Sequence, residues 1–65
     1  MIESAFLNSL IGTSKEVCMK MCKLNSYNFR IVREDETHFS CSLDFQSKRI
    51  NIEIDNGIVT GCFKG

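Results

Sequence analysis

The chain has 65 residues, and its eight basic and eight acidic side chains give a formal net charge of zero. A single domain of this size commits most of its large apolar residues to one core, which leaves little for a deep catalytic pocket, so we expect no enzyme. The charge balance also lacks the basic excess of nucleic-acid binders, and we expect no nucleic-acid partner.

The first residues do not form a targeting signal. Met1-Ile2-Glu3-Ser4 lacks the basic start and long apolar run of a signal peptide, and no apolar stretch reaches the length that crosses a bilayer. We therefore expect a cytoplasmic protein with reduced thiols and no membrane partner.

The N-terminal third is predicted to be helical. Apolar residues at helical spacing over residues 3–11 indicate a short helical turn that ends at Gly12. Thr13-Ser14-Lys15-Glu16 then has the form of a capping box with Thr13 as the cap, and it predicts a helix over about residues 14–24. One side of this helix is expected to carry Val17, Cys18, Met21, Cys22 and Leu24, and the other side Lys15, Lys20 and Lys23.

The remaining segments read as strands and turns. Residues 27–33 are rich in aromatic and β-branched side chains and predict a strand, and the polar residues 34–38 predict a turn. In residues 49–55, isoleucine alternates with polar side chains, which is typical of a half-buried strand. Asn56-Gly57 favours a tight hairpin into residues 58–60, because both residues tolerate positive φ.

These elements predict an α+β fold in which a single helix packs on a small twisted mixed β-sheet. The predicted domain spans residues 1–65, with an N-terminal turn at 1–12, a helix at 13–25, and a sheet at 27–63 that includes an extended loop at about 36–48.

The four cysteines raise the possibility of a metal site, disulfides or a nucleophile. Cys18 and Cys22 form one pair inside an apolar helical stripe, whereas structural zinc sites use two close pairs, so we expect no metal and no other cofactor. Disulfides remain an alternative if the protein is exported. His38 lies three residues from Cys41, but no orienting group accompanies them, which argues against a cysteine nucleophile.

Residues 42–49 allow two interpretations. In the first, Leu43 belongs to a loop that presents it to a partner, and Arg49 braces the loop from below. In the second, Leu43 and Phe45 are alternate core positions of a strand. In the loop interpretation, Asp44 accepts charge-assisted hydrogen bonds from Arg49, whose guanidinium offers five donors in one plane.

The order of these segments resembles the potato inhibitor I family of serine-protease inhibitors, and especially its small bacterial relatives. The resemblance covers the chain from about residue 9 to the end. It is carried by residues 9–16 before the helix, 29–33 as the first strand, 41–45 as the binding loop, and 49–55 as the next strand. Gln46 and Lys48 depart from the family pattern.

The resemblance implies a substrate-like inhibitor in which Leu43 enters the primary specificity pocket of a protease and the Leu43–Asp44 peptide is the scissile bond. A leucine there favours subtilisin-like or chymotrypsin-like targets. The implied reactive loop is Ser42, Leu43, Asp44 and Phe45, and the implied loop-bracing residues are Arg49 and Asn51.

A different class of function remains open. The same fold could serve as a small protein-interaction or ligand-sequestering module, for example a virus-encoded antagonist of a host protein, acting as a homodimer. A stable dimer whose activity is insensitive to changes at Leu43 would favour this alternative.

Overall fold

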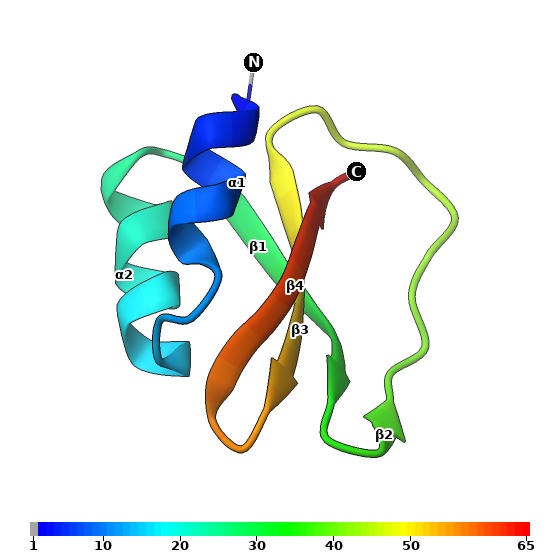
Figure 1. Ribbon diagram of the computed structural model, residues 1–65. Coiled ribbons are helices and arrows are strands. Elements are labelled where there is room, and N and C mark those ends of the chain that lie inside the picture. The colour runs from blue at the N-terminus through cyan, green and yellow to red at the C-terminus, as the bar shows by residue number, and fades with distance from the viewer. Residues whose placement is uncertain (1) are drawn as a thin grey trace.

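The chain folds into two helices and a four-stranded mixed sheet, as described by a computed structural model over residues 2–65 (Figure 1). The α+β class predicted from the sequence is therefore confirmed. The expectation of a single helix is wrong, because the N-terminal segment forms a helix of its own. In chain order the elements are α1 Ser4–Leu10, α2 Lys15–Leu24, β1 Asn28–Glu34, β2 Thr37–His38, β3 Arg49–Asp55 and β4 Ile58–Lys64.

Helix α2 begins one residue later than predicted. Its cap is Ser14, whose hydroxyl accepts from the backbone N–H of Val17 at 3.2 Å. The Thr13 hydroxyl instead donates to the Leu10 carbonyl at 2.6 Å. Thr13 is unavailable as the cap because its own carbonyl accepts from the Val59 N–H of β4 at 2.9 Å.

The buried stripe of α2 is narrower than expected. Cys18 and Cys22 are buried, as predicted, but Val17 is 46% and Leu24 is 83% exposed. Successive residues turn by about 100° around a helix, so Leu24 lies on the far side from Cys22, and Val17 lies to the side of Cys18. The outer surface of α2 is therefore partly apolar.

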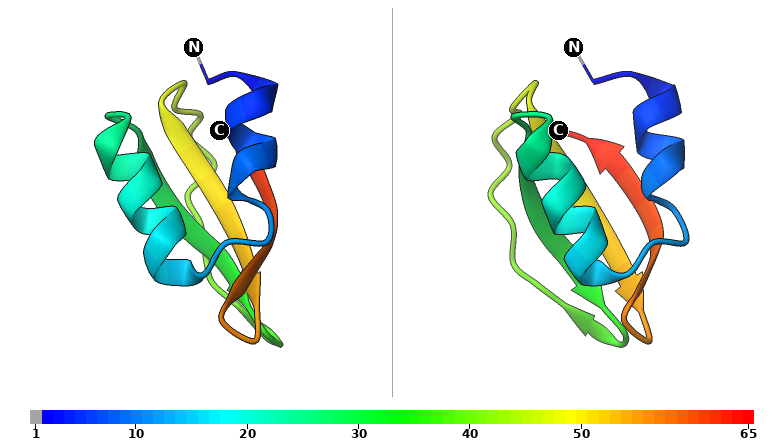
Figure 2. Two further views of the ribbon diagram at one scale, coloured as in Figure 1. Left: turned by 60° about the vertical axis from the view of Figure 1, so that its left-hand side comes forward. Right: turned by 90° about the vertical axis from the view of Figure 1, so that its left-hand side faces the viewer.

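The sheet has the strand order β2-β1-β3-β4, with β1 and β3 parallel and the other neighbours antiparallel. Ile50, Ile52 and Ile54 of β3 are at most 1% exposed and form the centre of the core. Core residues of α1 and α2 belong to the same cluster, so both helices pack against the isoleucine face. The turned views show both helices on the same side of the sheet (Figure 2).

Strand β3 has the predicted bounds, and the turn that follows it is also confirmed. Asn56 and Gly57 have φ values of 52° and 77°, as a type I′ hairpin requires. Strand β4, however, continues to Lys64, beyond the predicted residues 58–60, because it pairs with β3 as far as Ile50.

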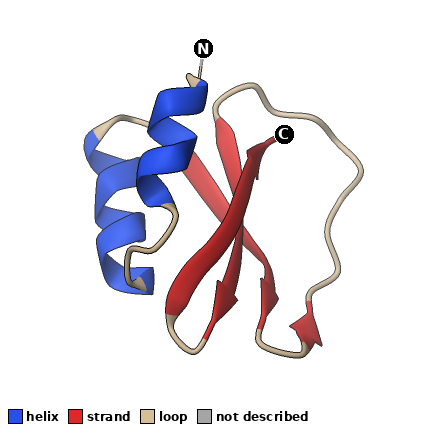
Figure 3. Ribbon diagram, viewed as in Figure 1, coloured by secondary structure: helices blue, strands red, loops and turns tan. Residues whose placement is uncertain are grey.

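Strand β1 begins and ends one residue later than predicted, and the predicted turn at residues 34–38 contains a short strand. β1 covers residues 28–34 rather than 27–33, and the two-residue strand β2 pairs back onto it. The left-handed residue Asp35, with a φ of 54°, makes this second turn possible. The irregular loop is consequently residues 39–48, shorter than the predicted 36–48 (Figure 3).

Within the described residues, neither helix is long and apolar enough to cross a membrane.

The loop leaves β2 at one end of the sheet, runs along its side, and enters β3 at the opposite end (Figure 1). The two helices lie on the other side of the sheet in that view.

Candidate binding loop

The loop of residues 39–48 exposes its apolar side chains. Leu43 is 102% exposed and Phe45 is 69% exposed, and neither lies in a strand. The interpretation of these two residues as core positions of a strand is therefore wrong. The loop interpretation holds because strand pairing begins only at Arg49, which pairs with Asn28.

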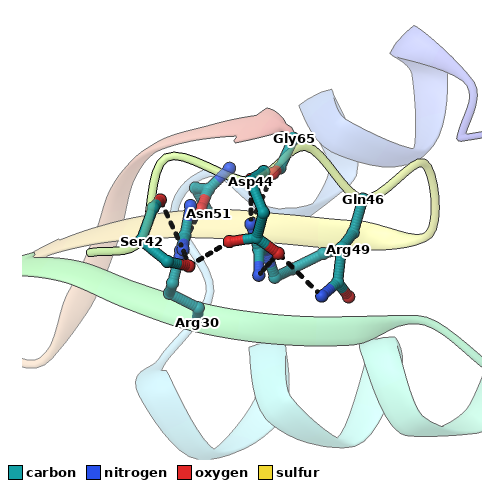
Figure 4. Close-up of polar contacts among 7 residues, drawn as sticks. All are labelled: Arg30, Ser42, Asp44, Gln46, Arg49, Asn51 and Gly65. Atoms are coloured by element: carbon teal, nitrogen blue, oxygen red, sulfur yellow. Dashed lines mark hydrogen bonds and ion pairs between the residues drawn. The ribbon is translucent and has the colours of Figure 1, made fainter.

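Arg49 connects the loop to the sheet from the first position of β3. Its side chain is largely buried, and Nη2 donates to the backbone oxygens of Asp44 and Gly65, each at 2.8 Å. Nη1 lies 3.4 Å from the Asp44 carboxylate (Figure 4). The contact expected between Arg49 and Asp44 is thus present, and one guanidinium joins the loop to the end of β4.

Asp44 is held as a carboxylate by three side chains. The Ser42 hydroxyl donates to one oxygen, and the Gln46 amide donates to the other at 3.0 Å. These bonds, and the charge of Arg49, lower the pKa of Asp44 from 3.8 to about 2. The carboxylate therefore remains ionised at neutral pH and can serve as a constant acceptor inside the loop.

Asn51, one of the two implied loop-bracing residues, contacts the loop through another side chain. It is 1% exposed, its Oδ1 accepts from Arg30 Nε at 2.7 Å, and its Nδ2 donates to the Phe63 carbonyl at 3.3 Å. Arg30 in turn extends Nη1 to within 3.4 Å of the Ser42 carbonyl and 3.3 Å of its hydroxyl. Asn51 therefore reaches the loop through Arg30 (Figure 4).

Arg30 is the site residue that sequence reasoning missed. It stands in β1 between Phe29 and Ile31, in the ordinary alternation of a half-buried strand, so no local signal in the sequence distinguished it from an arginine that only faces solvent. Its relation to the loop depends on the parallel register that places Arg30 opposite Asn51.

The cysteines do not form a reactive or metal-binding centre among the described residues. All four are free thiols, and no group of three potential ligands is placed to hold a metal ion in residues 2–65. Burial raises the pKa of Cys18 to about 12 and also raises the pKa of Cys22 and Cys62, which keeps these thiols protonated. His38 is exposed on β2, while the Cys41 thiol donates to the Phe39 carbonyl at 3.4 Å.

No protein-family model matches the chain, and no curated protein or solved structure matches it either. The choice between functions therefore depends on the loop and on how its neighbours are held.

Proposed function

We propose that the protein is a substrate-like inhibitor of serine proteases that presents the Leu43–Asp44 peptide to the active site of its target. One observation carries the proposal: a fully exposed leucine lies between two residues, Ser42 and Asp44, that are both hydrogen-bonded to the body of the domain.

The bonds on both sides of Leu43 supply what a substrate-like loop needs. A segment that is already fixed in its bound shape loses little conformational entropy on docking, so it gains affinity from few contacts. Arg49 is largely buried and is anchored to both Asp44 and Gly65, so it fixes the loop to a rigid strand rather than to another loop.

The side chains also indicate the class of target. Leu43 and Phe45 are two residues apart and exposed, whereas the side chain of the intervening Asp44 turns toward Arg49 (Figure 4). Two apolar groups on the outside of the loop suit proteases with apolar subsites, of the subtilisin-like or chymotrypsin-like kind. A trypsin-like pocket with a buried carboxylate would leave that charge unpaired against leucine.

The order of the elements supports the proposal. Helix α2 precedes β1, and the loop leads into β3, which pairs in parallel with β1; this order of helix, strand, loop and strand is the one that the resemblance to the potato inhibitor I family implies.

The proposal is tested by titrating subtilisin and chymotrypsin with the purified protein near stoichiometric concentration. We expect inhibition that Leu43→Asp abolishes, because a carboxylate cannot enter an apolar pocket without a large desolvation cost. Leu24→Asp is the matched control, since Leu24 is also exposed but lies on α2. Absence of inhibition across a panel of serine proteases would refute the proposal, as would equal effects of the two substitutions.

A second candidate is an interaction module that does not use the loop. It is favoured by the apolar side chains that are exposed at a distance from Leu43 in the sequence, among them Val17 and Leu24 of α2. Sedimentation that finds a stable dimer, disrupted by Leu24→Asp and not by Leu43→Asp, would select this function instead.

A further inference from the structure

We propose that Arg30 is a second positioning residue of the loop, which holds the residue before Leu43 as Arg49 holds the residue after it. The role in inhibition rests on the proposed function, whereas the role in fixing the loop does not.

The position of Arg30 is set by the sheet. It lies in β1 opposite Asn51 of β3, and its half-buried side chain extends toward the loop (Figure 4). The guanidinium uses two separate donors: Nε donates to Asn51 Oδ1 at 2.7 Å, and Nη1 approaches the carbonyl and the hydroxyl of Ser42 at 3.4 and 3.3 Å. The Arg30 side chain therefore links Asn51, a buried residue of β3, to Ser42 in the loop.

Asn51 fixes the orientation of this guanidinium. An amide oxygen must face the Arg30 Nε–H, and an amide NH2 must face the Phe63 carbonyl, so the two partners allow only one orientation of the Asn51 side chain. Asn51 is 1% exposed, so water does not compete for either bond. The Arg30 side chain is therefore already held in one orientation by Asn51, and it does not need to be ordered when the loop docks.

The two arginines act on opposite sides of the presented peptide. Arg30 contacts the carbonyl of Ser42, and Arg49 contacts the carbonyl of Asp44. The Ser42 hydroxyl in turn donates to the Asp44 carboxylate, which connects the two sides across Leu43. The Arg30 contacts to the loop are longer than the 2.8 Å bond from Arg49 to Asp44, so we expect Arg30 to have the smaller effect of the two.

A lysine cannot replace Arg30 in this arrangement. Lysine keeps the positive charge, but its single ammonium nitrogen cannot occupy the positions of Nε and Nη1 together. This separates a positioning role from a simple charge effect, because Arg30→Lys removes the first and preserves the second.

The control lies on the same strand. Arg33 forms a bidentate ion pair with Asp55, with N–O distances of 2.7 and 2.9 Å, and within the described residues it makes no hydrogen bond to Ser42 or Asp44. Arg33→Lys therefore removes a comparable planar contact from β1 and reports any general loosening of the strand.

The test measures backbone order by ¹⁵N relaxation in the wild type, Arg30→Lys and Arg33→Lys. We expect the amide order parameters of Ser42 and Leu43 to fall in Arg30→Lys from rigid values of about 0.85 toward about 0.6, and to fall less after Asp44. Arg33→Lys should leave all of them near the wild-type values. Equal order parameters in Arg30→Lys and wild type, or an equal fall in both variants, would overturn the inference.

A second measurement uses the protease that the wild type inhibits. We expect Arg30→Lys to be cleaved at Leu43–Asp44 about tenfold faster than the wild type, which corresponds to the loss of one modest hydrogen bond. If the wild type inhibits and Arg30→Lys is cleaved no faster, the inference fails while the proposed function stands. If the wild type inhibits no protease, the proposed function fails, and the relaxation data alone decide the role of Arg30.

Discussion

Replacing Arg49 with methionine should loosen the loop and the end of β4 together. Methionine keeps an unbranched apolar stem at a position that is 8% exposed, so packing is largely preserved while the guanidinium is lost. The two bonds from Nη2, to Asp44 and Gly65, are both 2.8 Å and charge-assisted, and each such bond is worth about 1.5–3 kcal/mol.

Two effects reduce the net loss. Nε of Arg49 is buried without a hydrogen-bond partner among the described residues, and removing it relieves a cost of about 1–3 kcal/mol. The carbonyl of Asp44 lies in an exposed residue and can be hydrated after the substitution. We therefore expect the free energy of unfolding to fall by about 2 kcal/mol, a large part of the roughly 3–10 kcal/mol expected for a domain of this size.

Urea unfolding followed by far-ultraviolet circular dichroism measures this loss, because the chain has no tryptophan. Loop order in the same variant should fall most at Asp44, on the side opposite to the effect of Arg30→Lys. A free energy of unfolding within about 0.5 kcal/mol of the wild type, together with an unchanged loop, would refute the assignment of Arg49 as the main brace.

Three further experiments test the core, the loop carboxylate and the thiols. Ile52→Ala should lower the free energy of unfolding by about 2–5 kcal/mol in urea titrations, because Ile52 is 1% exposed at the centre of the core; a loss under 1 kcal/mol would contradict its placement. The Asp44 carboxyl should titrate at about pH 2 by NMR, and nearer its ordinary pKa of 3.8 in Ser42→Ala, because the Ser42 bond is the largest cause of the shift; no change in that variant would exclude the bond. Because the folded pKa is the lower one, this stabilisation is complete above the ordinary pKa and is lost as the pH falls toward 2. With a thiol reagent, Cys41 should react before Cys18, whose burial and raised pKa protect it, and the reverse order would contradict the packing of α2.

The sequence allowed β3 and its hairpin to be predicted well because their determinants are local. Alternating isoleucines identify the strand, and Asn56-Gly57 identifies the turn that follows it. The cap of α2 was misplaced for the opposite reason. Thr13 and Ser14 can both cap a helix, and Glu16 made Thr13 the better match to a capping box. The pairing of Thr13 with β4, far along the chain, leaves Ser14 as the cap.

In the candidate site, too, a contact between residues close in the sequence was predicted, and a contact between distant residues was missed. The contact between Arg49 and Asp44 spans five residues, and the order of residues alone suggested it. The contact from Arg30 to Asn51 spans 21 residues and exists only because β1 and β3 pair in parallel, in a register that places these two residues opposite each other. A shift of that register by one residue would turn Arg30 to the other face of the sheet. The alternation of apolar residues excludes such a shift but does not distinguish registers that differ by two residues, so it does not place Arg30 opposite Asn51.

The central parallel pair also has a consequence for how the chain folds. Its first aligned residues, Asn28 and Arg49, are separated by 49 − 28 = 21 positions, and the intervening chain must close before their strands can join. Parallel pairing across such a separation is slow compared with forming a helix or a hairpin. We expect α2 and the β3–β4 hairpin to form early and the loop to close late, so that changes in loop length alter the folding rate more than the unfolding rate. The segment that we propose to contact a protease is then also the segment whose closure sets the rate of folding.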